Sequence, residues 1–238
     1  AAYTAVDNAE NDKVNTNRVN AQAPRVLAEE ALKVGAWLVH YSTDYVFDGS
    51  GNNAWEEKDE SNPLSEYGRS KLAGEQAIEN SGCKYLIFRT SWVFGSRGKN
   101  FAKTMLQLAS SRQVLSVIND QIGAPTSAAL IADCTAHAVR QAFSNPNLSG
   151  IYHLVASGQT TWYEYTKFII QKIDEVVDKY GEIKDNASPD LGNIRRNINI
   201  VRGKVNQSFG MALSQYNSLG YLDDIRETVV ENRRVLAV

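Results

Sequence analysis

Two hydrophobic patterns alternate along the first 160 or so residues of the chain. Runs that are apolar throughout predict strands buried on both faces, as in a parallel sheet covered by helices. Apolar positions that recur every three or four residues predict helices between these strands. The predicted strands are 36–43, 83–94, 114–118 and 151–156, and the predicted helices are 15–34, 63–80, 100–110 and 127–143.

This alternation predicts an α/β fold with an incomplete, Rossmann-like, doubly wound parallel sheet. Ligands of such sheets bind at the carboxyl ends of the strands. Pro24 lies inside the first helical pattern, where it marks either a kink or a first turn. A loop rich in Gly, Asn and acidic residues fills positions 48–62, and Pro63 opens the helix that follows it.

The pattern changes after about residue 171, and we therefore expect two parts, residues 1–171 and residues 172–238. Ser188 is a candidate N-cap and Pro189 follows it at the first helical position. A heptad-like apolar stripe then predicts one long, coiled-coil-like helix. Its members are Leu191, Ile194, Ile198, Val201 and Val205.

Composition excludes several classes of function. The formal net charge is −2, so no basic field is present to hold a nucleic acid or an anionic membrane. No apolar run reaches the roughly 20 residues that span a bilayer. Cys83 and Cys134 are far apart and have neither metal-site nor redox spacing, which favours a reducing, cytoplasmic setting and predicts no metal site.

Three Tyr-x-x-x-Lys pairs occur, at Tyr67/Lys71, Tyr163/Lys167 and Tyr180/Lys184. Positions i and i+4 share a face of a helix, but the spacing alone is a short motif with frequent chance matches. Only the first pair opens a helix after a buried strand that ends in hydroxyl groups. The other two pairs are interpreted as exposed polar residues of a helix.

The first pair has the groups needed to reduce a carbonyl by hydride transfer. An ammonium held near a phenol favours the phenolate and lowers the tyrosine pKa from its usual value of about 10. Tyr67 could then exchange a proton with a carbonyl oxygen near neutral pH, and the Thr43 hydroxyl could hydrogen-bond the same oxygen.

Thr43 with Tyr67-x-x-x-Lys71 resembles the extended short-chain dehydrogenases. Several further stretches together resemble the dTDP-4-dehydrorhamnose reductase family over residues 1 to about 171. They include GAWLVHYSTDYVFDG, PLSEYGRSKLAGEQA, FRTSWVFGSRGKNFAKTML and INDQIGAPTSAALIAD. That family reduces the 4-keto group of dTDP-4-dehydro-L-rhamnose with NADPH or NADH, so the resemblance implies a cofactor site and a nucleotide-sugar substrate.

The resemblance also implies roles for individual residues. Tyr67 would donate a proton to the C4 oxygen, Lys71 would lower the Tyr67 pKa and hold the nicotinamide ribose, and Thr43 would hydrogen-bond the reacting oxygen. Asp44 and Trp92 would contact the substrate. The cofactor would further be lined by Ala2, Tyr3, Thr4 and Tyr41. The three histidines, at positions 40, 137 and 153, are interpreted as core or surface residues.

Two features depart from the family pattern. The chain begins without Met and has no strand, Gly-rich turn and helix to receive a pyrophosphate, so we expect a missing N-terminal segment. Residues 175–238 resemble the coiled-coil region of the second type of MutS-like proteins. The interpretation is a chimera or fragment whose junction lies within 161–180.

Three alternatives to the reductase stay open. A relative of this family is a non-catalytic regulatory subunit of methionine adenosyltransferase, and the same fold could serve as such a partner. The predicted helix 188–213 could instead make the chain an interaction module, with a homo-oligomer as one outcome. Other sugar-nucleotide epimerases and dehydratases share the Tyr–Lys pair.

Overall fold

The computed structural model describes residues 2–109, 112 and 114–181, with side chains as far as residue 172. The predicted helix at 188–213 and most of the segment likened to MutS-like proteins lie outside these residues. The described part forms two compact units, residues 2–93 with 123–159, and residues 94–122 with 160–181. The boundary expected near residue 171 falls inside a helix, and the two-part division of the chain stays a prediction.

The first unit is built on a parallel sheet of three strands, β1 (Trp37–Thr43), β2 (Lys84–Thr90) and β6 (Gly150–His153), in the order β1-β2-β6. Trp37 pairs with Lys84, and Leu86 pairs with Gly150. The second apolar run, predicted as one strand over 83–94, is broken after Thr90. The remaining pair of residues, β3 (Val93–Phe94), joins β5 (Thr126–Ser127) in a separate sheet.

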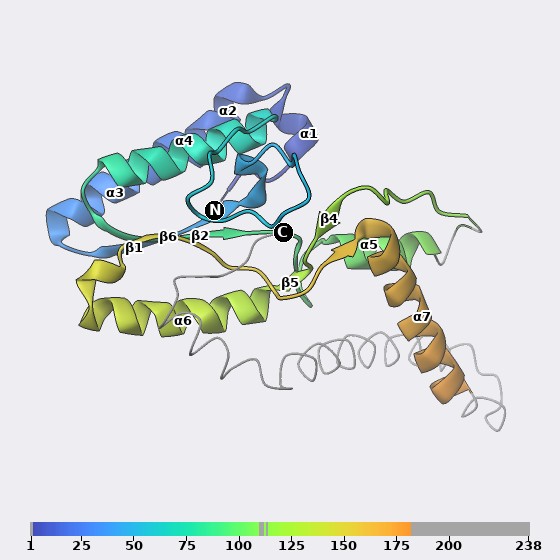
Figure 1. Cartoon of the computed structure of the whole chain (residues 1–238). Helices are drawn as coiled ribbons and strands as arrows, with labels where there is room; N and C mark the ends of the chain where they lie inside the picture. The colour runs from blue at the N-terminus through green and yellow to red at the C-terminus, as the bar shows by residue number, and fades with distance from the viewer. Residues whose placement is uncertain (1, 110–111, 113, 182–238) are drawn as a thin grey trace, which may run out of the picture. The chain divides into compact units, whose positions relative to one another are not determined.

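Helices cover both faces of the parallel sheet, which confirms the predicted doubly wound class. Figure 1 shows α3 (Ala23–Val34) and α4 (Glu66–Asn80) on one side and α6 (Ala128–Ser144) on the other. The core beneath α3 and α4 includes Ala28, Ala31, Ile78, Cys83 and Ile87. Because buried positions on α3 are three or four residues apart, the amphipathic pattern that predicted the helix also sets the face it turns to the sheet.

The chain enters this layer through short helices, α1 (Val6–Ala9), α2 (Lys13–Asn17) and a π-helical turn η1 (Arg18–Gln22). The predicted helix over 15–34 is therefore one helical path with a π-helical turn in its middle. Pro24 lies in the first turn of α3, which settles the choice between a kink and a first turn. The π-helical turn was not predicted, and such turns are frequent at functional sites.

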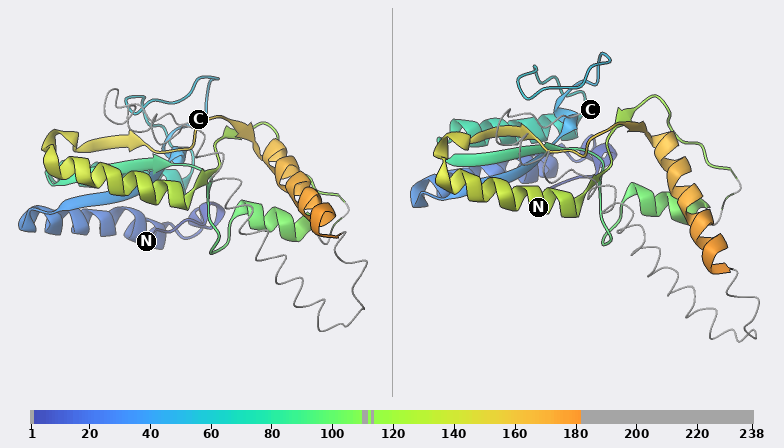
Figure 2. Two further views of the ribbon diagram at one scale, coloured as in Figure 1. Left: turned by 90° about the horizontal axis from the view of Figure 1, so that it is seen from below. Right: turned by 60° about the horizontal axis from the view of Figure 1, so that its bottom comes forward.

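The second unit contains α5 (Phe101–Ala109), β7 (Thr160–Thr161) and α7 (Trp162–Gly181), and β7 pairs with β4 (Ile122–Gly123). α5 and α7 pack against each other in all views (Figure 2). Their contact is aromatic, with the rings of Phe101 and Trp162 4.1 Å apart. The strand predicted at 114–118 is wrong, because the described residues there have no regular structure.

One buried ion pair joins α4 to the central strand. Arg89 Nε and Nη2 donate to the two carboxylate oxygens of Glu75, the closest distance being 2.7 Å between Nη2 and Oε2. Arg89 is 4% exposed and Glu75 is fully buried. The guanidinium carbon also lies 5.0 Å from the centre of the Phe47 ring. Because bidentate pairs have a fixed geometry, this contact sets the rotation of α4 on the sheet.

Glu75→Gln should lower the free energy of unfolding by about 3–5 kcal/mol, because it leaves a buried guanidinium without its counter-charge. Urea denaturation measures this loss. Glu79→Gln on the exposed side of the same helix is the matched control and should change the free energy by less than about 0.5 kcal/mol. An unchanged urea midpoint for Glu75→Gln would contradict the structural role of the pair.

His153 lies opposite Arg89 in the sheet register and is fully buried. Burial lowers its pKa from 6.5 to about 4. Between these values the unfolded chain binds more protons than the folded one, so the free energy of unfolding rises with pH across this window. Acidification from about pH 6.5 to about pH 4 should therefore lower the free energy of unfolding by about 1–3 kcal/mol through the protonation of His153.

This pH dependence is measured by urea denaturation at a series of pH values. His153→Gln should reduce the slope, whereas His137→Gln, on the exposed surface of α6, should leave it as in the parent chain. Equal slopes in the parent chain and in His153→Gln would show that the folded state accepts a proton at this position.

Candidate active site

Helix α4 carries the Tyr67/Lys71 pair into the first unit. The Ser65 hydroxyl accepts a hydrogen bond from Gly68 N at 3.1 Å and so caps the helix. The helix therefore begins at Glu66, three residues after Pro63. A side chain at Gly68 would overlap the carbonyl oxygen of Tyr45, so the helix approaches the end of β1 closely. The predicted helix is thus confirmed, and both residues of the pair are buried on its sheet-facing side.

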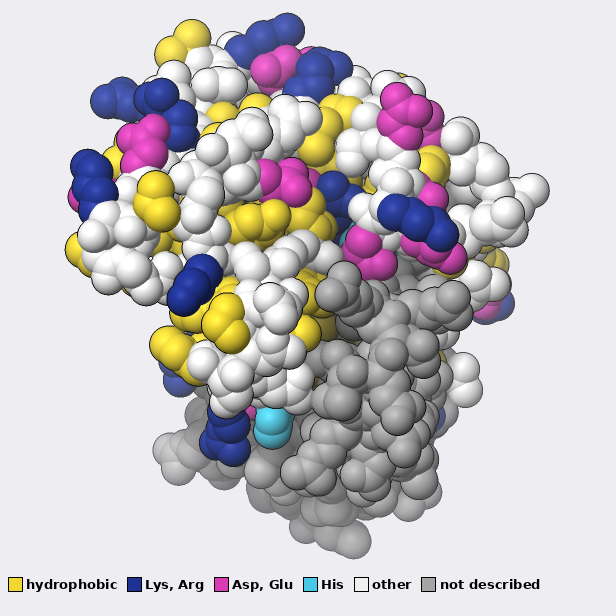
Figure 3. Space-filling view, turned by 60° about the vertical axis from the view of Figure 1, so that its left-hand side comes forward, with side chains coloured by type: hydrophobic (Ala, Val, Ile, Leu, Met, Phe, Trp, Pro, Cys, Tyr) yellow, Lys and Arg dark blue, Asp and Glu magenta, His cyan; other side chains and the backbone are white. Residues whose placement is uncertain are grey.

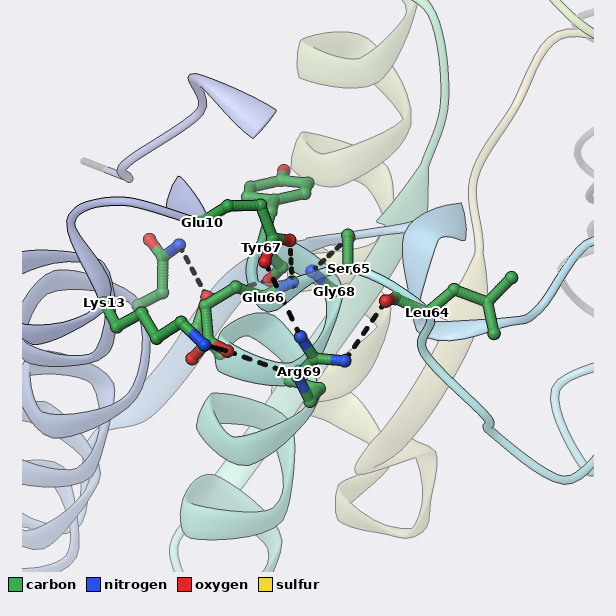
Figure 4. A network of polar contacts seen from close by, with 10 residues as sticks. Glu10, Lys13, Leu64, Ser65, Glu66, Tyr67, Gly68 and Arg69 are labelled. Atoms are coloured by element: carbon green, nitrogen blue, oxygen red, sulfur yellow. Dashed lines mark hydrogen bonds and ion pairs between the residues drawn. The ribbon is translucent and has the colours of Figure 1, made fainter. Parts of the chain in front are cut away.

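A network of polar contacts fixes the start of α4 to the short N-terminal helices (Figure 4). Glu10 accepts a hydrogen bond from Glu66 N at 2.7 Å, and Lys13 Nζ lies 3.8 Å from the Glu66 carboxylate. Arg69 Nε bonds the same carboxylate at 3.2 Å. The ring of Tyr67 points away from this network in Figure 4. The ion pairs are exposed, so they orient the helix end more than they stabilise it.

Thr43 lies at the carboxyl end of β1 and is buried next to Tyr67. Its hydroxyl donates to Asp44 Oδ1 at 2.9 Å and accepts from Tyr45 N at 3.2 Å. The Thr43 hydroxyl is close enough to Tyr67 to act on the pKa of the phenol, which it lowers. The structure therefore brings together the hydroxyl and the phenol that the sequence proposed as partners.

The expected lowering of the Tyr67 pKa is not found. Burial raises the pKa of Tyr67 from 10.0 to about 12, and the opposing hydrogen bond with Thr43 is the smaller effect. Lys71 does not act on the phenol; its ammonium bonds the carbonyl oxygen of Tyr41 at 2.6 Å and His40 Nε2 at 3.1 Å. The expectation neglected desolvation by burial, which raises the pKa of the phenol and is larger than the one effect that lowers it.

Burial shifts the charged neighbours too. It lowers the pKa of Lys71 from 10.5 to about 8, against the opposing charge of Glu75. It raises the pKa of Asp44 to about 6, although the Thr43 hydrogen bond acts in the other direction. At neutral pH Lys71 is mainly an ammonium, Asp44 mainly a carboxylate and Tyr67 a neutral phenol.

The segment expected to line the cofactor, Ala2 to Thr4, is tied to α4 through Asn20. Tyr3 N donates to Asn20 Oδ1 at 2.8 Å, and Asn20 Nδ2 donates to Tyr3 O at 3.0 Å and to Ser70 Oγ at 3.0 Å. Ser70 Oγ donates in turn to Tyr67 O at 2.7 Å. Asn20 belongs to the π-helical turn and is 1% exposed. Sequence reasoning missed it, because an Asn within a helical pattern carries no signal of its own.

The two remaining candidates, Tyr41 and Trp92, lie away from each other, one on β1 and one just after β2. The hydroxyl of Tyr41 lies 2.9 Å from Thr135 Oγ1 on α6, so its side chain is on the face opposite Lys71. Trp92 follows β2 with a φ of 47°, a left-handed conformation that is strained for a large side chain. Its ring lies against Gly123, where an added Cβ would be 2.7 Å from the indole nitrogen.

The second Tyr–Lys pair behaves as the sequence indicated. Lys167 bonds the carboxylate of Glu164 at 3.0 Å and lies over the half-exposed ring of Tyr163. The third pair, Tyr180/Lys184, lies outside the described side chains. Among the described residues, no group of three or more His, Cys, Asp or Glu is placed to hold a metal ion. None of the described helices has both the length and the apolar character needed to cross a bilayer.

Charged groups are mixed on the face in Figure 3. Lys and Arg side chains are scattered among Asp and Glu and among apolar side chains, and they form no continuous basic surface in this view. This distribution agrees with the near-neutral net charge.

Comparison with known proteins identifies relatives over most of the chain. The family model described as RmlD substrate binding domain matches residues 1–220. A dTDP-4-dehydrorhamnose reductase of Escherichia coli (strain K12) is 47% identical over 221 residues, which cover 91% of this chain and 74% of the relative. The similarity runs past residue 171, so the expected limit there is wrong, and the likeness of residues 175–238 to MutS-like proteins is not supported.

Solved structures give the same result. A dTDP-4-dehydrorhamnose reductase from Bacillus anthracis str. Ames in complex with NADP is 40% identical, with a TM-score of 0.66 and coverage of 73% of this chain and 60% of that one. The corresponding protein from Clostridium acetobutylicum is 40% identical with a TM-score of 0.65, covering 72% and 59%. The chain spans about three fifths of the length of these solved structures.

Gly123→Ala should displace the indole of Trp92, because no space exists for a methyl group beneath the ring. Overpacking of this kind costs about 1–3 kcal/mol of the free energy of unfolding. Tryptophan emission, compared with that of Trp92→Phe, reports the displacement, and urea denaturation reports the cost. Gly150→Ala is the matched control, because its new Cβ would meet only ordinary contacts at 3.8 Å. Identical emission spectra before and after Gly123→Ala would contradict the close packing.

Proposed function

Because the chain belongs to the dTDP-4-dehydrorhamnose reductase family, we propose that it reduces the 4-keto group of dTDP-4-dehydro-L-rhamnose with NADPH or NADH. The observation that carries this proposal is the juxtaposition of three groups. Thr43 and Tyr67 are both buried at the carboxyl end of β1, where the Thr43 hydroxyl acts to lower the Tyr67 pKa, and Lys71 lies one turn further along α4.

In this proposal Tyr67 is the proton donor. A general acid must be protonated before the reaction, and a phenol with a pKa of about 12 is protonated at neutral pH. Reduction turns the carbonyl oxygen into an alkoxide-like oxygen, and this oxygen takes the phenolic proton. To hydrogen-bond the oxygen on which charge develops, the Thr43 hydroxyl would turn its single proton from Asp44 toward that oxygen. A raised pKa thus suits the reduction better than the lowered pKa expected from the sequence.

Lys71 and the N-terminal segment are proposed to hold the cofactor. A bound NADPH or NADH supplies the hydride for the carbonyl carbon. An ammonium has three protons, and the two bonds to β1 leave one for a hydroxyl acceptor such as those of a ribose. Ala2, Tyr3 and Thr4 reach the same region through Asn20. Tyr41 would contribute through its carbonyl, which positions Lys71, more than through its ring.

Asp44 and Trp92 are proposed as substrate contacts. The Asp44 carboxylate uses one oxygen for the Thr43 hydroxyl, and its remaining lone pairs could accept hydrogen bonds from sugar hydroxyls. Trp92 is held in a left-handed conformation next to the last residues of β2. Backbone strain of this kind concentrates at ligand-binding sites, and a flat indole suits the apolar face of a sugar ring.

The non-catalytic alternative is not favoured, because the chain retains the three groups of the reductase and its relatives are named reductases. The cysteines Cys83 and Cys134 are unpaired and buried, which supports the proposal of a reducing, cytoplasmic setting. A homo-oligomer and the absence of a nucleic-acid partner stay predictions.

Tyr67→Phe should lower turnover by roughly 10²- to 10⁴-fold, the usual contribution of a general acid. The affinity for NADPH should change little, since the ring and the helix remain. Turnover is measured by NADPH oxidation with dTDP-4-dehydro-L-rhamnose, and binding by fluorescence titration with NADPH.

Tyr163→Phe is the matched control, because Tyr163 begins the second, exposed Tyr–Lys pair. It should leave turnover as in the parent chain. Turnover retained in Tyr67→Phe would overturn the assigned role. An absence of both NADPH binding and turnover in the folded parent chain would overturn the proposed function of this chain.

A further inference from the structure

The ammonium of Lys71 is held by strand β1 and not by a carboxylate. Its two hydrogen-bond acceptors are the carbonyl oxygen of Tyr41 at 2.6 Å and Nε2 of His40 at 3.1 Å. The Lys71 side chain is 2% exposed, so water has little access to it. An ammonium in such surroundings depends on the acceptors that the protein supplies.

Glu75 is the carboxylate on α4 nearest in sequence to Lys71, but its oxygens bond Arg89. It acts on Lys71 through its charge only. Tyr67, one turn before Lys71, is a neutral phenol. The hydrogen bonding of the ammonium within the described residues therefore comes from β1, and His40 is the side chain that contributes to it.

His40 can accept this bond only when neutral, because a doubly protonated imidazole has no lone pair to offer. Burial, together with the charge of Lys71, lowers the pKa of His40 from 6.5 to about 3. At neutral pH the ring is therefore uncharged. With Nε2 facing an ammonium, the geometry assigns the single ring proton to Nδ1.

We propose that His40 is a positioning residue for Lys71. Its Nε2 accepts one ammonium proton, the carbonyl of Tyr41 accepts a second, and the third is left directed at the bound cofactor. This inference rests on the proposed function for its consequence, the hold on the cofactor. The contact between His40 and Lys71 stands without it. Sequence analysis interpreted His40 as a core or surface residue.

The first test needs no substitution. Nitrogen-15 spectra of the imidazole groups in the folded full chain distinguish the two neutral tautomers, and the His40 resonances are assigned by their loss in His40→Gln. The expected result at pH 7 is a neutral ring with the proton on Nδ1 and an accepting Nε2. A proton on Nε2, or a charged ring at pH 7, would overturn the proposal.

The second test compares two substitutions that differ in one respect. His40→Gln keeps an acceptor at a similar reach, whereas His40→Leu fills the space without one. A hydrogen bond to the charged form favours that form, so His40→Leu should lower the Lys71 pKa below that of the parent chain. His40→Gln should preserve it, and His137→Gln on the surface of α6 serves as the histidine control.

The Lys71 pKa is followed through its ε-carbon resonance in lysine-labelled protein, assigned by its absence in Lys71→Met. At a pH near the parent pKa of about 8, His40→Leu should also bind NADPH several-fold more weakly than His40→Gln. If His40→Leu fails to fold, the tautomer measurement and the titration of Lys71 in His40→Gln still test the positioning role of His40.

The outcomes separate this inference from the proposed function. A lowered Lys71 pKa in His40→Leu with no NADPH binding in any variant supports the positioning role and overturns the reductase proposal for this chain. An unchanged Lys71 pKa with unchanged NADPH binding overturns the positioning role and leaves the reductase proposal intact.

Discussion

The buried pair between Arg89 and Glu75 is the contact on which the arrangement of the site depends. α4 could turn about its axis on a sheet that offers mainly apolar contacts, and apolar contacts alone are weakly directional. A bidentate ion pair fixes that rotation because both oxygens must meet both nitrogens. Lys71 and Tyr67 lie one and two turns earlier on the same face, so their direction toward β1 follows from this contact.

The same pair decides the electrostatics of the site. Since Glu75 is neutralised by Arg89, it leaves Lys71 as a buried cation without a carboxylate at hydrogen-bond distance among the described contacts. Desolvation then dominates, lowering the pKa of Lys71 and raising those of Tyr67 and Asp44. At neutral pH the site therefore holds a buried ammonium at Lys71 and a carboxylate at Asp44 in surroundings with little water.

Most of the fold could be predicted from the sequence because hydrophobic periodicity reports burial directly. β1 was predicted to within one residue because its run is largely apolar. α4 was predicted to its end at Asn80, but its start was placed three residues too early, because Ser65 and not Pro63 caps the helix. The break after Thr90 was missed because Trp92 is itself apolar, so the pattern continues although the backbone turns left-handed. The short strand expected at 114–118 is apolar at four of its five positions but has no neighbouring strand to pair with in the described part.

The sequence predicted only those features of the site that depend on residues close together in the chain. The spacing of Tyr67 and Lys71 is visible in the sequence, whereas the acceptors of the ammonium lie 30 residues earlier and depend on the packing of α4 against β1. The direction of the Tyr67 pKa shift was wrong for the same reason, because desolvation is a property of the whole fold. Alternation along β1 places His40 and Ser42 on one face, which is the signal that could have drawn attention to His40.

The contacts of Arg89 also extend to the loop that follows Thr43. Phe47 lies between the guanidinium of Arg89 and the indole of Trp55, with the two rings stacked 4.6 Å apart. Ser61 lies 3.4 Å from Arg89 Nη2, near the far end of the same loop. One buried cation thus orients the helix that carries Tyr67 and anchors the chain that continues from Thr43. Because both contacts run through Arg89, the placement of Tyr67 beside Thr43 depends on the packing of the interior.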